Sequence, residues 1–160
     1  MINVCIQGLG FVGAAMAVAV SSARDKRNQP IYSVVGVDLE TELGQSRIEA
    51  VNRGEFPFLT SDELLIKAVH EANEVGNLSA TTDESAYSAA EIIIVDLPFD
   101  LSLEEQQPSL HSQLSLLEDA LGSITRNLSS SVLLLIETTL PPGTCEKVII
   151  PFVQRELEVR

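Results

Sequence analysis

The chain has 160 residues, of which 45% are hydrophobic, and its ten basic against 23 acidic residues give a formal net charge of −13. This length suits one domain with a core of its own, and so acidic a surface argues against nucleic acid as a partner. No apolar run is long enough to cross a membrane, no signal-peptide pattern opens the chain, and two cysteines form neither a disulfide framework nor a metal site. We therefore expect a cytoplasmic globular protein with no membrane or metal partner.

Short apolar runs alternate with longer amphipathic stretches along the chain. Strands are expected at residues 2–6, 32–37, 77–82, 91–98 and 131–139, and helices at residues 11–22, 42–53, 61–73, 111–128 and from about Thr144. Two polar loops are expected at residues 22–30, which are basic, and 100–109. Strands that are apolar on both faces and alternate with helices predict an α/β fold, a doubly wound parallel sheet of the Rossmann type over residues 1–160.

The segment "GLGFVG" directly follows the first expected strand and opens the first expected helix. In that setting the pattern predicts a dinucleotide-binding turn. Gly8 permits the tight turn, Gly10 lets the backbone approach a pyrophosphate, and Gly13 lets the helix pack against the strand. The helix N-terminus supplies N–H groups and partial positive charge to the phosphates, a device that an acidic domain needs.

The second part of the dinucleotide pattern is an acid at the end of the second strand. Asp38 stands there in "VVGVDLE", at a longer spacing from Gly13 than usual because the basic loop intervenes. Its carboxylate is expected to accept hydrogen bonds from the adenosine ribose. Together with Glu40 it would repel a 2′-phosphate, so we expect the cofactor to be NAD rather than NADP.

Three later segments follow these motifs in order: "VDLETELGQSRIEAVNRGEFPF", "LSATTDESAYSAAEIIIVDLPFD" and "IETTLPPGTCEKVIIPFV". With them the chain resembles the N-terminal NAD-binding domain of the UDP-glucose/GDP-mannose dehydrogenase family, which includes UDP-N-acetyl-hexosamine 6-dehydrogenases. The resemblance implies oxidation of the C6 alcohol of a UDP- or GDP-sugar to a carboxylate with two NAD, through a thioester on a cysteine. It also implies a role in polysaccharide biosynthesis and a homo-oligomeric parent enzyme.

The resemblance also implies roles for individual residues. Thr139 matches a residue near the nicotinamide that helps to order the catalytic water. The residues matched to cofactor contacts are Gly8, Gly10, Phe11, Val12, Gly13, Asp38, Thr82, Pro98 and Glu137.

The sequence also departs from the family pattern. Asp96-Leu97-Pro98 stands where the family has Pro-Thr-Pro, and "EFPFLTSDELL" replaces a segment that commonly ends in Glu-Pro-Gly-Leu. The family's catalytic cysteine, central helix and substrate-binding domain follow this domain, so we expect a cofactor-binding fragment that is inactive alone.

The cysteines and histidines are not expected to carry the chemistry. Cys145 opens the last helix where the family has no nucleophile, and Cys5 is expected to be buried in the first strand. His70 and His111 have no partner at ligand spacing. Two alternative functions remain open at this point: a stand-alone, non-catalytic NAD-binding module, and the cofactor domain of a 6-phosphogluconate or 3-hydroxyacid type dehydrogenase.

Overall fold

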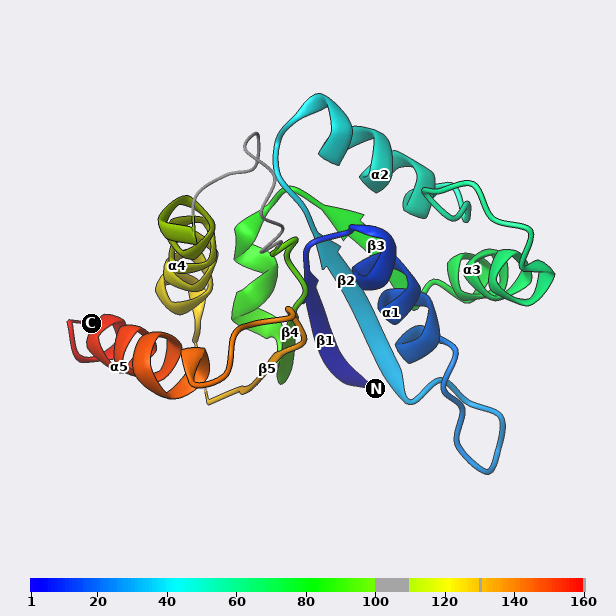
Figure 1. Ribbon diagram of the computed structural model, residues 1–160. Coiled ribbons are helices and arrows are strands. Elements are labelled where there is room, and N and C mark those ends of the chain that lie inside the picture. Colours follow the sequence, from blue (N-terminus) through cyan, green and yellow to red (C-terminus); the bar gives the residue numbers. More distant parts are fainter. Residues whose placement is uncertain (100–109, 130, 160) are drawn as a thin grey trace.

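The computed structural model describes residues 1–99, 110–129 and 131–159 (Figure 1). Its centre is one parallel sheet with the strand order β3-β2-β1-β4-β5. The strands are β1 (Ile2–Gln7), β2 (Tyr32–Val37), β3 (Leu78–Thr81), β4 (Ile92–Val95) and β5 (Leu133–Ile136). The chain runs outward from β1 to one edge of the sheet and then crosses back to build the other half. This arrangement confirms the doubly wound α/β fold.

Helices cover both faces of the sheet. On one side lie α1 (Phe11–Ser21), α2 (Glu42–Asn52) and α3 (Glu63–Val75), and on the other lie α4 (Leu110–Asn127), α5 (Ile150–Glu158) and the 3₁₀ helix η1 (Glu84–Ala89) (Figure 1). Within the described part of the chain, no helix combines the length and apolar character needed to span a bilayer.

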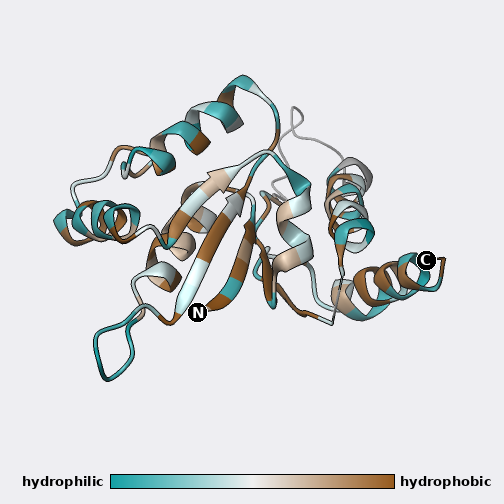
Figure 2. Cartoon of the chain, turned by 180° about the vertical axis from the view of Figure 1, so that it is seen from behind, coloured by the Kyte–Doolittle hydropathy of each residue, from teal (hydrophilic) through white to brown (hydrophobic). Residues whose placement is uncertain are grey.

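The strands supply two apolar layers because successive side chains of a strand point to opposite faces. In β1, Val4 and Ile6 pack with α1, α2 and α3, whereas Cys5 packs on the face that η1 and α4 cover. In β4 the same alternation places Ile94 in the first layer and Ile93 in the second. Figure 2 shows the strands as largely hydrophobic and α2 and α3 as rich in hydrophilic residues.

Local chemistry explains where several elements begin and end. Asp62 caps α3 by accepting hydrogen bonds from the N–H groups of Leu64 and Leu65, and Gly76 ends the helix in the left-handed conformation. The segment expected to be a helix from Thr144 begins instead with one π-helical turn, Cys145–Ile149. Pro151 explains this difference, because it cannot donate the regular hydrogen bond to the preceding turn.

Residues 22–30 form a hairpin-like loop closed by an antiparallel bridge between Arg24 and Pro30. Its tip is exposed, as the basic and polar sequence predicts, and Figure 2 shows it projecting from the body as a hydrophilic arm. The Asn77 side chain secures its base by donating hydrogen bonds to the carbonyl oxygens of Ser21 and Tyr32. The other expected loop, residues 100–109, lies outside the described residues, as does the side chain of His111.

Candidate functional site

The turn between β1 and α1 has a geometry that only glycine satisfies at two positions. Gly8 adopts a φ of 96°, and a Cβ there would lie 2.3 Å from the carbonyl oxygen of Asp96. A Cβ on Gly13 would lie 2.0 Å from the carbonyl oxygen of Gly8. Both distances are far inside van der Waals contact. The tight turn and the close helix packing inferred from the sequence are therefore present.

Gly10 differs from the other two glycines because the space beside it is open. A Cβ on Gly10 would meet no atom within 4 Å. Gly10 is also the N-cap residue of α1, and no side chain caps the helix there. The two residues that follow are exposed, with Phe11 at 55% and Val12 at 57% of their full accessible surface. The turn thus presents backbone N–H groups and a positive helix end to an open face, which suits a pyrophosphate.

Asp38 lies at the carboxyl end of β2, beside this turn. Its carboxylate accepts hydrogen bonds from the Leu9 N–H at 3.2 Å and the Leu39 N–H at 2.8 Å. Arg47 of α2 pairs with the same carboxylate at 3.4 Å, and the Asp38 side chain is only 10% exposed. Sequence reasoning missed Arg47, because nothing in the sequence indicates that α2 returns this side chain to the end of β2.

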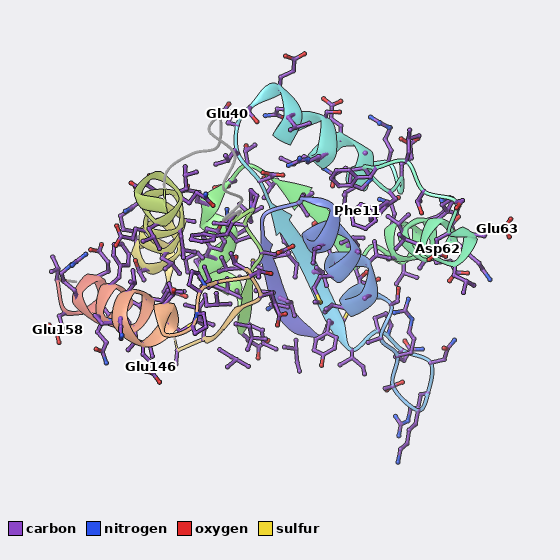
Figure 3. The ribbon with its side chains drawn as sticks, viewed as in Figure 1. Phe11, Glu40, Asp62, Glu63, Glu146 and Glu158 are labelled. Carbon is purple, nitrogen blue, oxygen red and sulfur yellow. The ribbon has the colours of Figure 1, made fainter. Side chains whose placement is uncertain are left out.

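An aromatic cluster joins the turn to the connection between α2 and α3. Phe11 packs edge-on against Phe56 and Phe58, with ring centroids 5.6 Å apart in each pair, and the Arg47 guanidinium lies 5.4 Å from the centre of the Phe58 ring. Figure 3 shows Phe11 between α1 and this connection. The segment that departs from the family pattern therefore fixes the position of Arg47 through aromatic and cation–π contacts.

The remaining matched residues follow the carboxyl ends of other strands, at the same edge of the sheet as the glycine turn. Thr82 follows β3 and is half-buried, and Pro98 follows β4 and is exposed. Beyond β5, Glu137 is exposed and its N–H donates to the carbonyl oxygen of Val95 at 2.9 Å. In a doubly wound sheet, the crevice outside these strand ends is where ligands bind.

Thr138 and Thr139 differ in how far their side chains are buried. Thr138 is buried, and its hydroxyl oxygen accepts a hydrogen bond from the Leu97 N–H at 3.0 Å, which ties the end of β5 to the end of β4. Thr139 is exposed. Of the two hydroxyl groups, the one on Thr139 is therefore accessible to a ligand or a water molecule.

Asp96 is a second acid at this edge that sequence reasoning noted only as a departure from the family pattern. It directly follows β4 and is half-buried. One carboxylate oxygen lies 3.2 Å from the position that a Cβ on Gly13 would occupy. Burial raises the pKa of the Asp96 carboxyl, the nearby Glu137 raises it further, and the Gly13 N–H lowers it.

The cysteines and the described histidine lie apart from this constellation. Cys5 is buried in β1, as expected, and burial raises the pKa of its thiol to about 11. Cys145 is exposed in the π-helical turn. His70 lies on α3, 3.5 Å from Glu74 in the next turn.

A doubly wound sheet with a glycine turn at the N-terminus of α1 and an acid at the end of β2 defines a dinucleotide-binding domain. A sequence model of the UDP-glucose/GDP-mannose dehydrogenase family, NAD binding domain, matches residues 2–160. The chain belongs to this family, and its cofactor is NAD. This membership decides against the 6-phosphogluconate and 3-hydroxyacid dehydrogenase alternative.

Individual relatives agree with this assignment. UDP-N-acetyl-D-mannosamine dehydrogenase of Escherichia coli (strain K12) is 31% identical over 145 residues, which are 91% of this chain and 30% of that protein. The Pyrococcus horikoshii enzyme of the same name is 26% identical over the same shares of the two chains. The crystal structure of NDP-N-acetyl-D-galactosaminuronic acid dehydrogenase from Methanosarcina mazei Go1 shares the fold, with a TM-score of 0.82 and 22% identity over 98% of this chain and 31% of that one. The chain thus spans about a third of the length of these proteins.

Proposed function

We propose that the chain binds NAD across the carboxyl ends of its strands, with the pyrophosphate on the glycine turn. Gly10 leaves room for the phosphates, and the N–H groups of Phe11 and Val12 face them at the N-terminus of α1. Gly8 and Gly13 hold the turn in shape. The open space beside Gly10, an N-cap residue with no side chain to cap α1, is the observation that carries this proposal.

Asp38 is proposed to receive the adenosine ribose. The carboxylate is already oriented by two backbone N–H groups, so little freedom is lost when a ribose hydroxyl donates to it. Arg47 stands beside it and adds guanidinium N–H donors for the ribose oxygen atoms. Thr82, Pro98 and Glu137 line the remainder of the cofactor groove.

We further propose that the chain is the cofactor-binding part of a longer nucleotide-sugar 6-dehydrogenase. That enzyme would oxidise the C6 alcohol of a UDP- or GDP-sugar to a carboxylate. Two successive hydride transfers, each to one NAD, would oxidise the alcohol carbon to the level of a thioester on the catalytic cysteine. Thr139 would order the water that hydrolyses this thioester to the carboxylate. The names of the relatives and the third of their length that the chain spans support this proposal.

Other parts of that enzyme complete the proposal. A further domain would supply the sugar-binding surface and the nucleophilic cysteine. The enzyme would act in polysaccharide biosynthesis, in the cytoplasm and as a homo-oligomer. The 160-residue chain alone would then bind NAD but not reduce it, because neither the sugar carbon nor the nucleophile would be held beside the nicotinamide.

Calorimetric titration of the purified chain with NAD and with NADP tests the cofactor site. We expect tighter binding of NAD, and Asp38→Asn should weaken NAD binding about tenfold while improving the relative affinity for NADP. Glu74→Gln, which removes an equal charge on α3, should change neither affinity.

Two results would contradict the proposal. NADP binding that equals or exceeds NAD binding would show that Arg47 rather than Asp38 governs the ribose position. Appearance of NADH absorbance when the chain is mixed with NAD and a UDP- or GDP-sugar would show that the chain carries a complete active site.

A further inference from the structure

Asp96, which directly follows β4, is an acidic residue that packs against the glycine turn. Its carbonyl oxygen lies 2.3 Å from the position that a Cβ on Gly8 would occupy, and its carboxylate lies next to Gly13, in the first turn of α1. The backbone N–H of Asp96 donates to the carbonyl oxygen of Gln7 at 2.9 Å, which continues the pairing of β4 with β1. The carboxylate is therefore held at the helix end that the cofactor phosphates are proposed to approach.

Within the described residues, Asp96 faces the partial positive charge of the α1 N-terminus but no basic side chain. The segment Phe11–Ser21 contains no charged residue, and β1 ends in the neutral Gln7. Glu137, just beyond the end of β5, is an acidic neighbour that raises the pKa of the Asp96 carboxyl. Across the glycine turn, Asp38 adds a third carboxylate, whose charge Arg47 offsets through their ion pair.

Two like charges cannot share one helix end without cost. A pyrophosphate at the turn would raise the free energy of the ionised Asp96 carboxylate, whereas protonation would remove the repulsion. By linkage, binding then becomes tighter as the pH falls, and protons are taken up on binding. In the free chain, burial and Glu137 raise the pKa of the Asp96 carboxyl, and the Gly13 N–H offsets part of this rise.

We propose that Asp96 couples dinucleotide binding at the glycine turn to the uptake of one proton, so that this residue sets the pH dependence of cofactor affinity. This inference rests on the cofactor site proposed above. In the bound state, one oxygen of the neutral carboxyl group still accepts from the Gly13 N–H. Because the carboxyl group is protonated, Asp96 no longer places a negative charge at the helix end. Asp96 thus acts as an affinity-determining residue rather than as a contact of the reacting atoms.

Calorimetry of NAD binding to the 160-residue chain between about pH 5.5 and about pH 8.5 tests this coupling. We expect the affinity to fall as the pH rises, and titrations in two buffers of different ionisation enthalpy should reveal net proton uptake. Asp96→Asn should abolish both effects. It should also tighten binding at the alkaline end by on the order of fivefold to tenfold, the lower range of coupling between sites.

Two further variants separate this local effect from general electrostatics. Glu137→Gln should keep the pH dependence but move its midpoint to lower pH, because Asp96 loses an acidic neighbour. Glu158→Gln removes the same charge from the end of α5, far from Phe11 in Figure 3, and should behave as the unaltered chain.

The experiments distinguish failure of the proposed proton coupling from failure of the cofactor site. Weaker NAD binding by Asp96→Asn would make the carboxylate a cofactor ligand and overturn the inference, as would a pH dependence that survives the substitution. Thermal unfolding of each variant, monitored by circular dichroism, shows whether a loss of NAD affinity reflects unfolding of the chain. No NAD binding by the unaltered chain at any pH would refute the cofactor site itself.

Discussion

Gly10 and Gly13 lie three residues apart in one motif, yet the structure assigns opposite consequences to an alanine at each. A methyl group on Gly13 would be 2.0 Å from a backbone carbonyl oxygen, more than an ångström inside the 3.4 Å at which ordinary contact begins. Neither the β1–α1 turn nor α1 can move away from this contact without disturbing β1. A methyl group on Gly10 meets nothing within 4 Å, and its φ of −59° suits any residue.

The magnitudes follow from these contacts. Overpacking of about 3 kcal/mol at Gly13, offset by about 1 kcal/mol from the better helix propensity of alanine, leaves a net loss of about 2 kcal/mol in the free energy of unfolding. Gly10→Ala should cost about 1 kcal/mol or less, as an N-cap change. If the methyl group displaces the phosphates from one N–H donor, the affinity for NAD should fall by about 1.5–3 kcal/mol, roughly tenfold to 150-fold.

Urea denaturation followed by circular dichroism measures the first effect, and calorimetric titration with NAD measures the second. We expect Gly10→Ala to bind NAD poorly but to stay stable, and Gly13→Ala to lose stability. Gly10→Val extends the series with a larger side chain and should remain folded. Wild-type NAD affinity in Gly10→Ala, or a loss of stability as large as that of Gly13→Ala, would refute the assignment of Gly10 to the phosphates.

Two other pairs of residues give matched tests. Thr138→Ala should lower the free energy of unfolding by about 1–3 kcal/mol, because it leaves the Leu97 N–H without its acceptor. Thr139→Ala should change it by less than about 0.5 kcal/mol, and equal effects of the two variants in urea denaturation would contradict the different burial of the two side chains. A thiol reagent at neutral pH should modify Cys145 quickly and Cys5 only after denaturation, because burial raises the pKa of Cys5 to about 11. Rapid modification of both thiols in the folded chain would show that β1 is accessible to the reagent.

The fold was predictable because each layer leaves a strong pattern in the sequence. Buried parallel strands are continuous apolar runs, and every expected strand and helix has a counterpart in the structure. Boundaries were less predictable. The last strand was expected at residues 131–139, but β5 is only Leu133–Ile136, because Thr138 turns its hydroxyl group toward the end of β4 instead of continuing the ladder. The 3₁₀ helix η1 was not predicted, although Asp83, which caps it, is a recognisable signal.

The candidate site divides in a similar way. Gly8 and Gly13 could be interpreted from the sequence because a turn that needs glycine imposes a fixed spacing along the chain. Arg47 and Asp96 could not, because their importance depends on which way α2 and the end of β4 present their side chains. Such contacts join residues far apart in sequence and have no periodicity of their own.

The arm formed by residues 22–30 has a practical consequence. It lies near the amino ends of the strands, across the molecule from the glycine turn (Figure 1). Its bridge at Arg24 and Pro30 closes the loop independently of its tip. Lengthening such a loop costs little, about 0.6 kcal/mol for each doubling. The arm is therefore a natural attachment point for a fluorescent label or an affinity tag, which would report on the domain while leaving its ligand-facing edge untouched.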